Sequence, residues 1–403
     1  MRRCLELAGL GAGHTAPNPM VGAVLVFEGR IIGEGYHERY GQAHAEVNCI
    51  RSVPAGDLHH IRQSTLYVSL EPCAHHGKTP PCADLIIEKK IPKVVVGCRD
   101  PFAAVDGKGI EKLLAAGVIV ELGVLGKECE WLNKRFLTFH TLHRPYIVLK
   151  WAQSANGRLG AGAGPASQVR AESLVETASH TGAASHGGPG GGSRILISNE
   201  YTNRLVHKWR SAEAAILVGT NTALSDDPAL TARLWTGPDP IRLVVDTALR
   251  LPLSLQVFDG KVRTIVFNTL RHDMGGGHDL AGNGRGPAQG QEPAKARGFV
   301  QAGGSTQGQA GGLLYYQLAT DSSLVHQIVI ALYQLNIQSV LVEGGARLLQ
   351  SFIDEGYWDE ARVITNEGLQ IPEGLPSPVL GDAEILSHER VFTDNICYYA
   401  PGR

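Results

Sequence analysis

The chain lacks any long run of apolar residues. No stretch approaches the roughly 20 apolar residues that a membrane-spanning helix needs, so we expect no membrane partner. The first residues, MRRCLELAGLGAGHT, carry two arginines but no apolar segment of the length found in signal peptides. We therefore expect a cytoplasmic protein.

The chain also has little net charge and few cysteines. Its 37 basic and 39 acidic residues give a net charge of −2, so no strong basic field exists to hold a long nucleic acid and a small substrate is favoured. Seven cysteines among 403 residues argue against a disulfide framework and for reduced thiols. The length suits about two domains of roughly 100–200 residues each.

Short Val-rich runs alternate with helical patterns in both halves, which predicts an α/β fold. The pattern breaks at Arg144-Pro145, so we predict one domain at residues 1–142 and a second at residues 143–403. Residues 160–193 and 271–312 are rich in Gly, Ala and Ser. They have too few large apolar residues to form a core and are predicted to be flexible surface insertions.

The expected elements follow from these patterns. The first half should contain strands at Val21–Phe27, Thr65–Leu70, Lys93–Gly97 and Val118–Leu122, and helices at His44–Val53, Cys82–Lys90, Gly107–Ala116 and Lys127–His140. The second half should contain strands at Tyr146–Trp151, Ala214–Gly219, Ile241–Asp246, Arg263–Asn268, Ser339–Glu343 and Ala361–Asn366, and helices at Asn199–Arg210, Ser322–Leu335 and Ala346–Glu355. A loop is expected at Thr222–Pro228.

The strongest motif combines His44 and Glu46 with Cys73 and Cys82, each cysteine being preceded by proline. An imidazole and two thiolates suit the tetrahedral, borderline-soft preference of zinc. Three protein ligands leave one coordination position open, which is typical of a catalytic site. The Glu46 carboxylate, two residues after His44, can reach a water beside the metal and pass a proton to a leaving amine. This arrangement indicates a zinc deaminase of a nucleobase-like ring.

The spacing of the cysteines leaves an alternative open. Cys73 and Cys82 are nine positions apart rather than three, with the loop AHHGKTPP between them. A closed structural zinc site would need a fourth ligand, for which His75 and His76 are candidates. We favour the catalytic site because all its parts occur in order. The remaining cysteines have no such neighbours and are predicted to be packing residues: Cys4, Cys49, Cys98, Cys129 and Cys397.

Several longer segments of the sequence are similar to those of a known family. In the first half they are TAPNPMVGAVLV, GYHERYGQAHAEV, TLYVSLEPCAHHGKTPPC, VVVGCRDPFAAVDGKGI and LNKRF. In the second half they are RPYIVLKWAQSANGRL, LVHKWRSAEAAILVGTNTALSDDPALTAR, PIRLVVDTALRLP and VLVEGGARLL. With these segments, the chain resembles the bifunctional deaminase/reductases of riboflavin biosynthesis. The long loop ending in TPPC is specific to this group among zinc deaminases.

The resemblance implies a cytidine-deaminase-like three-layer domain followed by a dihydrofolate-reductase-like α/β domain. It also implies two successive reactions with Zn²⁺ and NADPH as cofactors. The first removes an amino group as ammonia from 2,5-diamino-6-(5-phosphoribosylamino)pyrimidin-4-one. The second reduces the ribosyl group of that product to ribityl. The expected partner is thus a small phosphorylated pyrimidine ribotide, and a homo-oligomer is left open.

The resemblance also carries site residues onto this sequence. It implies that His44, Cys73 and Cys82 bind zinc and that Glu46 is catalytic. The implied NADPH contacts are Gln153, Thr222, Asp226, Thr247, Gly345, Ala346, Arg347 and Leu348. The implied substrate contacts are Asn18 and His37 in the deaminase, and Lys150, Arg210, Leu230, Arg233 and Glu343 in the reductase.

Some of these residues have a second interpretation. Asn18, in a Pro-Asn-Pro turn, can read polar ring edges or simply form the turn. Arginines suit a sugar phosphate, because a guanidinium pairs with phosphate oxygens, but they can also be solvated surface charges. Lys150 and Glu343 could form a structural ion pair. Gly344-Gly345 after a strand, with a helix following, is typical of a diphosphate cradle, although the motif alone is weak.

The chain departs from the family at two places in its second half. Asn156 stands in SANG where the family usually has Ser-Leu-Asp-Gly, so the turn keeps its shape and loses a charge. The family's segment ending in Trp-Ile before the Asn199–Arg210 helix is replaced by the glycine-rich insertion. The substrate serine and cofactor-stacking tryptophan found there cannot be carried over.

Three other functions compete with the bifunctional enzyme. One is a deaminase whose C-terminal half is a degenerate module. Another is a nucleic-acid deaminase, which the balanced charge and the lack of a basic, aromatic-rich stripe disfavour. The last is a zinc-stabilised binding protein, in which Glu46→Gln would leave function intact.

Overall fold

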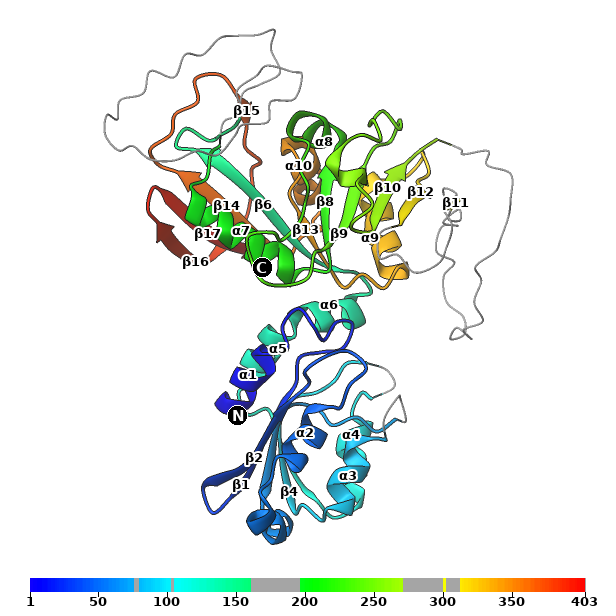
Figure 1. Cartoon of the computed structure of the whole chain (residues 1–403), viewed down its shortest axis with the longest axis vertical. Coiled ribbons are helices and arrows are strands. Elements are labelled where there is room, and N and C mark those ends of the chain that lie inside the picture. The colour runs from blue at the N-terminus through cyan, green and yellow to red at the C-terminus, as the bar shows by residue number, and fades with distance from the viewer. Residues whose placement is uncertain (76–79, 103–104, 161–195, 271–299, 302–311, 403) are drawn as a thin grey trace.

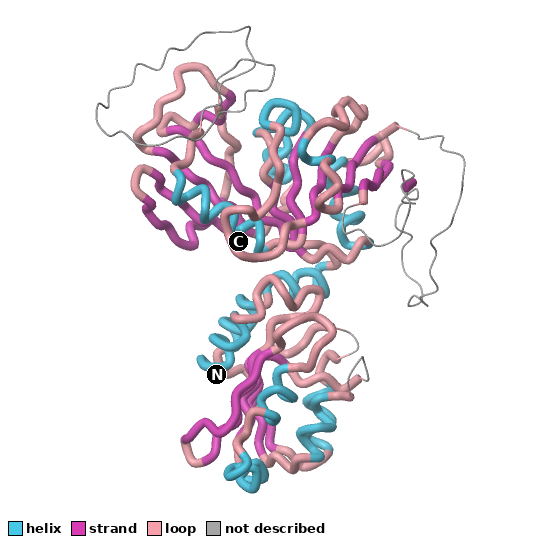
Figure 2. Tube along the Cα trace, viewed as in Figure 1, coloured by secondary structure: helices cyan, strands magenta, loops and turns pink. Residues whose placement is uncertain are grey.

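The computed structural model describes residues 1–75, 80–102, 105–160, 196–270, 300–301 and 312–402. Apart from residues at their edges and 300–301, both predicted insertions lie outside the described residues. Figure 1 shows two lobes joined at a helix, and Figure 2 shows a sheet with flanking helices in each lobe. No described helix is both long and apolar enough to span a bilayer.

The first lobe has a five-stranded sheet in the order β2-β1-β3-β4-β5. Strands β1 and β2 are antiparallel, β1 and β3 are antiparallel, and β3, β4 and β5 are parallel. Its elements are α1 (Arg2–Gly9), β1 (Gly22–Phe27), β2 (Arg30–Tyr36), α2 (Ala45–Arg51), the 3₁₀ helix η1 (Ala55–Gln63), β3 (Thr65–Leu70), α3 (Cys82–Glu88), β4 (Lys93–Cys98), α4 (Lys108–Ala115), β5 (Ile119–Leu122), α5 (Gly126–Leu132) and α6 (Lys134–Leu142).

Helices cover both faces of this sheet and make three layers. Helices α2, α3 and α4 bury Ile50, Ile86 and Leu113 against one face. Helix α1 packs Leu7 against Val24 on the other face, where α5 also lies through Cys129. Burial of these apolar side chains supplies the main stabilisation of the lobe, at about 25 cal/mol per Å² removed from water.

The second lobe has a ten-stranded sheet in the order β11-β12-β10-β9-β8-β13-β6-β14-β17-β16, counted over the described residues. Its centre, from β12 to β14, is parallel, and β14, β17 and β16 pair antiparallel. Parallel strands buried on both faces explain the continuous Val-, Ile- and Leu-rich runs in the sequence. Helices α9 and α10 pack on one face, and α7 and α8 on the other.

The bounds of the elements in the second lobe are as follows. They are β6 (Tyr146–Ser154), β7 (Arg158–Leu159), α7 (Glu200–Ala212), β8 (Ala215–Gly219), α8 (Thr220–Asp226), β9 (Ile241–Val245), the 3₁₀ helix η2 (Gln256–Phe258), β10 (Thr264–Asn268), β11 (Val300–Gln301), β12 (Leu313–Gln317), α9 (Leu324–Gln334), β13 (Ser339–Val342), α10 (Ala346–Asp354), β14 (Glu360–Asn366), β15 (Leu375–Pro376), β16 (Ala383–Val391) and β17 (Asp394–Pro401). Strands β15 and β7 form a separate two-stranded sheet.

Two predicted elements were wrong. The single helix expected at Lys127–His140 is two helices, because Asn133 leaves the helical path to bond the backbone of Met20. The loop expected at Thr222–Pro228 is largely helix α8, which packs Ala223 under the sheet. Thr220 stabilises the start of this helix by donating its hydroxyl to the carbonyl of Val245, 2.7 Å away.

Candidate active sites

The predicted metal ligands meet at one point in the first lobe. His44 is the residue before α2, Cys73 follows β3, and Cys82 begins α3. Their ligand atoms all lie within 4.8 Å of one another, with Nδ1 of His44 3.5 Å from Sγ of Cys73 and 3.4 Å from Sγ of Cys82. A tetrahedral zinc with Zn–S of about 2.3 Å and Zn–N of about 2.0–2.1 Å places sulfur and nitrogen about 3.5 Å apart. The three residues therefore fit a zinc ion.

The alternative of a closed structural site finds no support in the described residues. His75 lines the neighbouring pocket but is not a member of the three-residue group, and His76 lies outside the described residues. The group thus has the three ligands of an open site. Four of the remaining cysteines are buried in the core, as predicted, whereas Cys397 is half-buried in β17.

Glu46 lies in the first turn of α2 and is 3% exposed. Burial raises the pKa of its carboxyl group above the ordinary value. A carboxyl group can accept and donate a proton during catalysis. Because it also lines the pocket beside His44, it is placed where proton transfer is needed.

Asn18 and His37, both implied as substrate contacts, lie together. Nδ1 of His37 is 3.0 Å from the carbonyl of Ala43, which can only accept, so that nitrogen carries the proton. Nε2 of His37 therefore accepts from Nδ2 of Asn18, 3.1 Å away. Burial lowers the pKa of His37 and favours this neutral form. The contact orients the amide of Asn18, so that residue does more than form a turn.

The sequence reasoning missed Glu71, which fixes the loop that carries Cys73. Its buried carboxylate accepts from the backbone N–H groups of Asp100, Gly107, Gly109 and Ile110, at 3.0–3.3 Å. Gly109 is required there, because a Cβ atom would lie 1.9 Å from the carbonyl oxygen of Pro72. The only available signal was Glu71 standing directly before Pro-Cys.

A pocket of about 420 Å³ opens beside the metal ligands. It is lined by residues from both lobes, and the sequence did not predict the contribution of the second one. From the first lobe come Asn18, His37, His44, Glu46, Cys73 and others, and from the second come Asn336 and Gln338. Asp100 is also in the lining, and burial raises its pKa to about 7. The size suits a small ring substrate.

In the second lobe, the implied cofactor residues lie near the carboxyl ends of parallel strands. Thr222 is in α8 after β8, Thr247 follows β9, and Gly345 precedes α10 after β13. Thr222 and Gly345 are close, because a Cβ atom on Gly345 would lie 3.3 Å from Oγ1 of Thr222. Ligands of open α/β sheets bind at such strand ends. Ala346, Arg347 and Leu348 form the first turn of α10.

The other reductase residues that the family resemblance implies lie in β6 and around the end of α8. The amide of Gln153 already contacts Trp151 and Thr365. Asp226 ends α8 and is exposed, as is Arg233, while Leu230 is buried. Asp226, Leu230 and Arg233 thus lie between the end of α8 and the start of β9.

Arg210, Lys150 and Glu343 form one buried charge cluster. Arg210 donates two hydrogen bonds of 2.8 Å to Glu343, and Nζ of Lys150 lies 3.6 Å from the same carboxylate. Although burial opposes ionisation, Arg210 and Lys150 hold the pKa of Glu343 at about 2. The ion pair considered for Lys150 and Glu343 is therefore present, and Arg210 shares it.

Asn156, at the turn where the chain departs from the family, is held by three hydrogen bonds. Oδ1 of Asn156 accepts from the hydroxyl of Ser154 at 2.6 Å and from the backbone N–H of Ile371 at 3.2 Å. Nδ2 of Asn156 donates to the carbonyl of Ile371 at 2.9 Å. The segment that replaces the family's Trp-Ile lies in part outside the described residues.

Comparisons with known proteins agree with this arrangement. The family model "Cytidine and deoxycytidylate deaminase zinc-binding region" matches residues 1–98, and "RibD C-terminal domain" matches residues 145–366. The predicted deaminase and reductase fold classes are confirmed. Zinc and NADPH are the cofactors that these two domains use.

Relatives match along nearly the whole chain. The riboflavin biosynthesis protein RibD of Aquifex aeolicus is 36% identical over 92% of this chain and 88% of its own length. RibD of Bacillus amyloliquefaciens is 35% identical over 89% and 81%.

Solved structures agree. A diaminohydroxyphosphoribosylaminopyrimidine deaminase/5-amino-6-(5-phosphoribosylamino)uracil reductase from Thermotoga maritima is 30% identical, with a TM-score of 0.74 and coverage of 100% of this chain and 97% of that one. Acinetobacter baumannii RibD has a TM-score of 0.75 at 27% identity, with coverage of 100% and 98%. The chain therefore belongs to the RibD family of bifunctional deaminase/reductases of riboflavin biosynthesis.

Proposed function

We propose that this chain deaminates 2,5-diamino-6-(5-phosphoribosylamino)pyrimidin-4-one in its first lobe and reduces the ribosyl group of the product to ribityl in its second. The observation that carries the proposal is the meeting of His44, Cys73 and Cys82 beside the buried Glu46 in a pocket of about 420 Å³. The chain is both a hydrolase and an oxidoreductase, and it acts on a small pyrimidine.

In the first lobe, His44, Cys73 and Cys82 hold the zinc ion. When bound, zinc activates water for attack on the ring carbon that carries the amino group. Glu46 accepts a proton during this attack and delivers a proton to the departing nitrogen, so that water is consumed and ammonia leaves. Its position suits the role, because the buried carboxylate lines the pocket beside His44.

Asn18 and His37 orient the ring. His37 accepts one N–H of the Asn18 amide, which leaves the Asn18 carbonyl to accept an N–H of the pyrimidine. A site that must pair a ring N–H discriminates against rings that lack it, since a polar group would then be buried without a partner.

In the second lobe, the first turn of α10 binds the diphosphate of NADPH. Backbone N–H groups at a helix N-terminus favour anions, and Gly345, Ala346, Arg347 and Leu348 supply that turn. Thr222, Asp226, Thr247 and Gln153 complete the cofactor contacts. When bound, NADPH supplies the hydride.

The remaining residues of the second lobe hold the ribotide. Arg233 and Arg210 attract its phosphate, and Leu230 packs beside it. Glu343 and Lys150 fix the position of Arg210 through the buried charge cluster. We also propose that the protein is cytoplasmic, with its thiols reduced, and that it has no nucleic-acid or membrane partner.

Mass spectrometry of the reaction products tests both halves. The diaminopyrimidinone ribotide incubated without NADPH should exchange its amino group for oxygen and release ammonia. Addition of NADPH should then add two hydrogens to the product. Deamination without any reduction would support the function proposed for the first lobe and contradict the function proposed for the second.

A further inference from the structure

The segment Thr15–Val21 carries Asn18 into the deaminase pocket, yet residues of the second lobe hold it. We propose that Gln338 of the reductase half is a positioning residue for substrate binding in the deaminase half. The inference rests on the proposed deaminase function and adds a dependence of that site on the docked second lobe.

The first observation is a direct hydrogen bond between the lobes. Nε2 of Gln338 donates to the carbonyl of Pro17 at 2.7 Å, and Gln338 is 6% exposed. Pro17 directly precedes Asn18, so the bond restrains the backbone beside the side chain that faces the ring. Loss of such a bond would leave a partly buried carbonyl without this donor.

The second observation is a pair of hydrogen bonds at the other end of the same segment. Asn133 accepts from the backbone N–H of Met20 at 2.8 Å and donates to its carbonyl at 2.9 Å. Asn133 directly precedes α6, and α6 is itself held by the second lobe. The segment is thus fixed on both sides of Asn18 by groups that the reductase lobe supplies or anchors.

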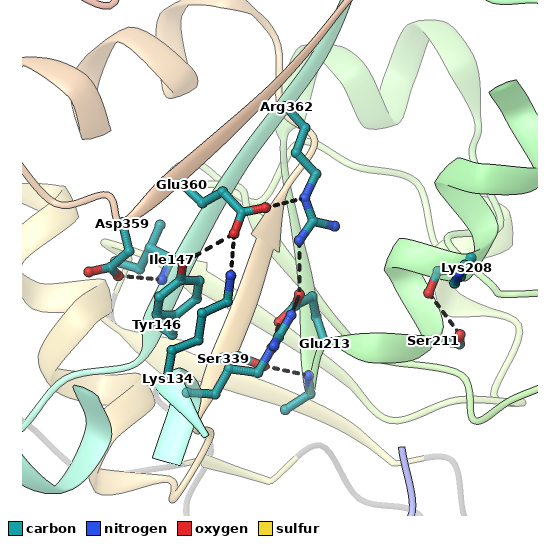
Figure 3. Close-up of polar contacts among 12 residues, drawn as sticks. Lys134, Tyr146, Ile147, Lys208, Ser211, Glu213, Ser339, Asp359, Glu360 and Arg362 are labelled. Atoms are coloured by element: carbon teal, nitrogen blue, oxygen red, sulfur yellow. Dashed lines mark hydrogen bonds and ion pairs between the residues drawn. The ribbon is translucent and has the colours of Figure 1, made fainter. Parts of the chain in front are cut away.

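Figure 3 shows how α6 is anchored. Nζ of Lys134 lies 2.6 Å from Oε2 of Glu360. The guanidinium of Arg135, the next residue, donates two hydrogen bonds to the carboxylate of Glu213. Arg362 joins the two carboxylates, at 2.6 Å from Glu360 and 3.9 Å from Glu213. Buried charges are held in place when each has partners, so this network fixes α6 against the sheet.

The third observation is that the pocket wall itself crosses the lobes. Asn336 and Gln338 line it from the second lobe, and Phe136 and His140 line it from α6. The sequence motif LNKRF, residues 132–136, therefore has a role beyond packing: it joins the Met20 bond, the anchoring cations and a pocket residue in one short segment.

Gln338 can be changed without touching the reductase site. It directly precedes β13, whereas Glu343 and Gly345 follow the opposite end of that strand. It is also distinct from the metal ligands and Glu46. A change at Gln338 should therefore alter how the ribotide is bound in the first lobe. Zinc retention and hydride transfer should be unchanged.

The experiment is steady-state deamination by the full chain carrying Gln338→Met, which keeps the length of the side chain and removes the donor. We expect KM for the diaminopyrimidinone ribotide to rise about three- to tenfold, with kcat changed less than about twofold. Reduction of separately supplied deaminated product should be unchanged. Amide hydrogen exchange of the measurable amides within residues 15–21 should become faster.

The matched control is Gln327→Met. Gln327 makes the same kind of bond within the second lobe, from Nε2 to the carbonyl of Ala319 at 3.1 Å. It should leave KM for deamination unchanged. Gln338→Glu, which cannot donate to Pro17 when ionised, should reproduce the effect of Gln338→Met.

Three outcomes would overturn the inference: an unchanged KM in both Gln338 variants, a fall in kcat alone, or an equal loss of both activities, which would indicate general unfolding. If the unsubstituted chain releases no ammonia, the proposed function fails. The exchange rates of residues 15–21 then still decide whether Gln338 holds the segment.

Discussion

The predicted metal ligands of the deaminase lobe lie close to one another, whereas the residues proposed to bind NADPH are spread over the ends of several strands. His44, Cys73 and Cys82 converge on one point. In the second lobe, by contrast, Thr222, Thr247 and Gly345 belong to three different strand–helix connections. A metal dictates its ligands closely, while a long cofactor is held by many weak contacts, so the first site tolerates far less change.

Glu46→Gln should give the largest difference between the activities of the two lobes. Deamination should fall about 10²- to 10⁴-fold, because the amide cannot carry the proton. Zinc content and reduction of the deaminated product should be unchanged. Ammonia release, metal analysis and NADPH oxidation measure the three quantities. Full deaminase activity in Glu46→Gln would contradict the role of Glu46 as the group that carries the proton.

Glu343→Gln should act on the second region alone, and chiefly through stability. Removal of this carboxylate charge leaves Arg210 and Lys150 buried beside each other without their shared counter-charge. Breaking such a pair typically costs about 3–5 kcal/mol of unfolding free energy. Urea denaturation followed by fluorescence measures this loss. Unchanged stability would show that water or another group compensates the two cations.

Acid should weaken the contact between the two regions. Burial disfavours the ionised form of Glu360, but Arg362 and Lys134 hold the pKa of this carboxyl at about 2. The Glu360 carboxylate therefore contributes its full stabilisation at pH values above the ordinary glutamate pKa of about 4.5. This stabilisation is lost as the pH falls toward about 2. The free energy of unfolding should decline over that window.

The decline should be shallower in Glu360→Gln than in the unsubstituted chain. Glu384→Gln, at an exposed position, serves as the control and should leave the slope unchanged. Identical pH profiles for Glu360→Gln and the unsubstituted chain would show that the carboxylate is not held ionised by the interface.

Asn156→Asp should give the smallest effect. The substitution restores the residue usual in the family, keeps the acceptor for Ser154 and Ile371, and loses the donor to the carbonyl of Ile371. We expect a loss of about 1 kcal/mol in unfolding free energy. A thermal melt of the two proteins measures it. A gain in stability would mean that the charge of the family residue matters more than the lost hydrogen bond.

The comparison also explains what the sequence could predict. The buried strands of both sheets were found because continuous apolar runs need no knowledge of the partner strand. Strand β2 was missed because Gly33 and Gly35 look like turn residues. A Cβ atom at either position would lie 2.2–2.6 Å from backbone atoms of Cys49, so α2 can approach the strand only because these residues are glycine.

Strand β16, at one edge of the second sheet, was missed for a different reason. Strand β16 is mostly exposed and lacks a buried alternation, so its sequence carries no periodic signal. Likewise, the metal ligands could be named from their chemical types and order, whereas Glu71 and Gln338 could not. These residues act on backbone groups far away in the chain, and nothing in their own neighbourhood reveals that.

The most direct test of the account is metal analysis and ammonia release for the purified chain and for Cys73→Ser. We predict one Zn²⁺ per unsubstituted chain. Loss of the thiolate should remove most of the metal and abolish deamination, while reduction of the deaminated product continues. Full ammonia release by Cys73→Ser, or an unsubstituted protein that is active without zinc, would contradict it.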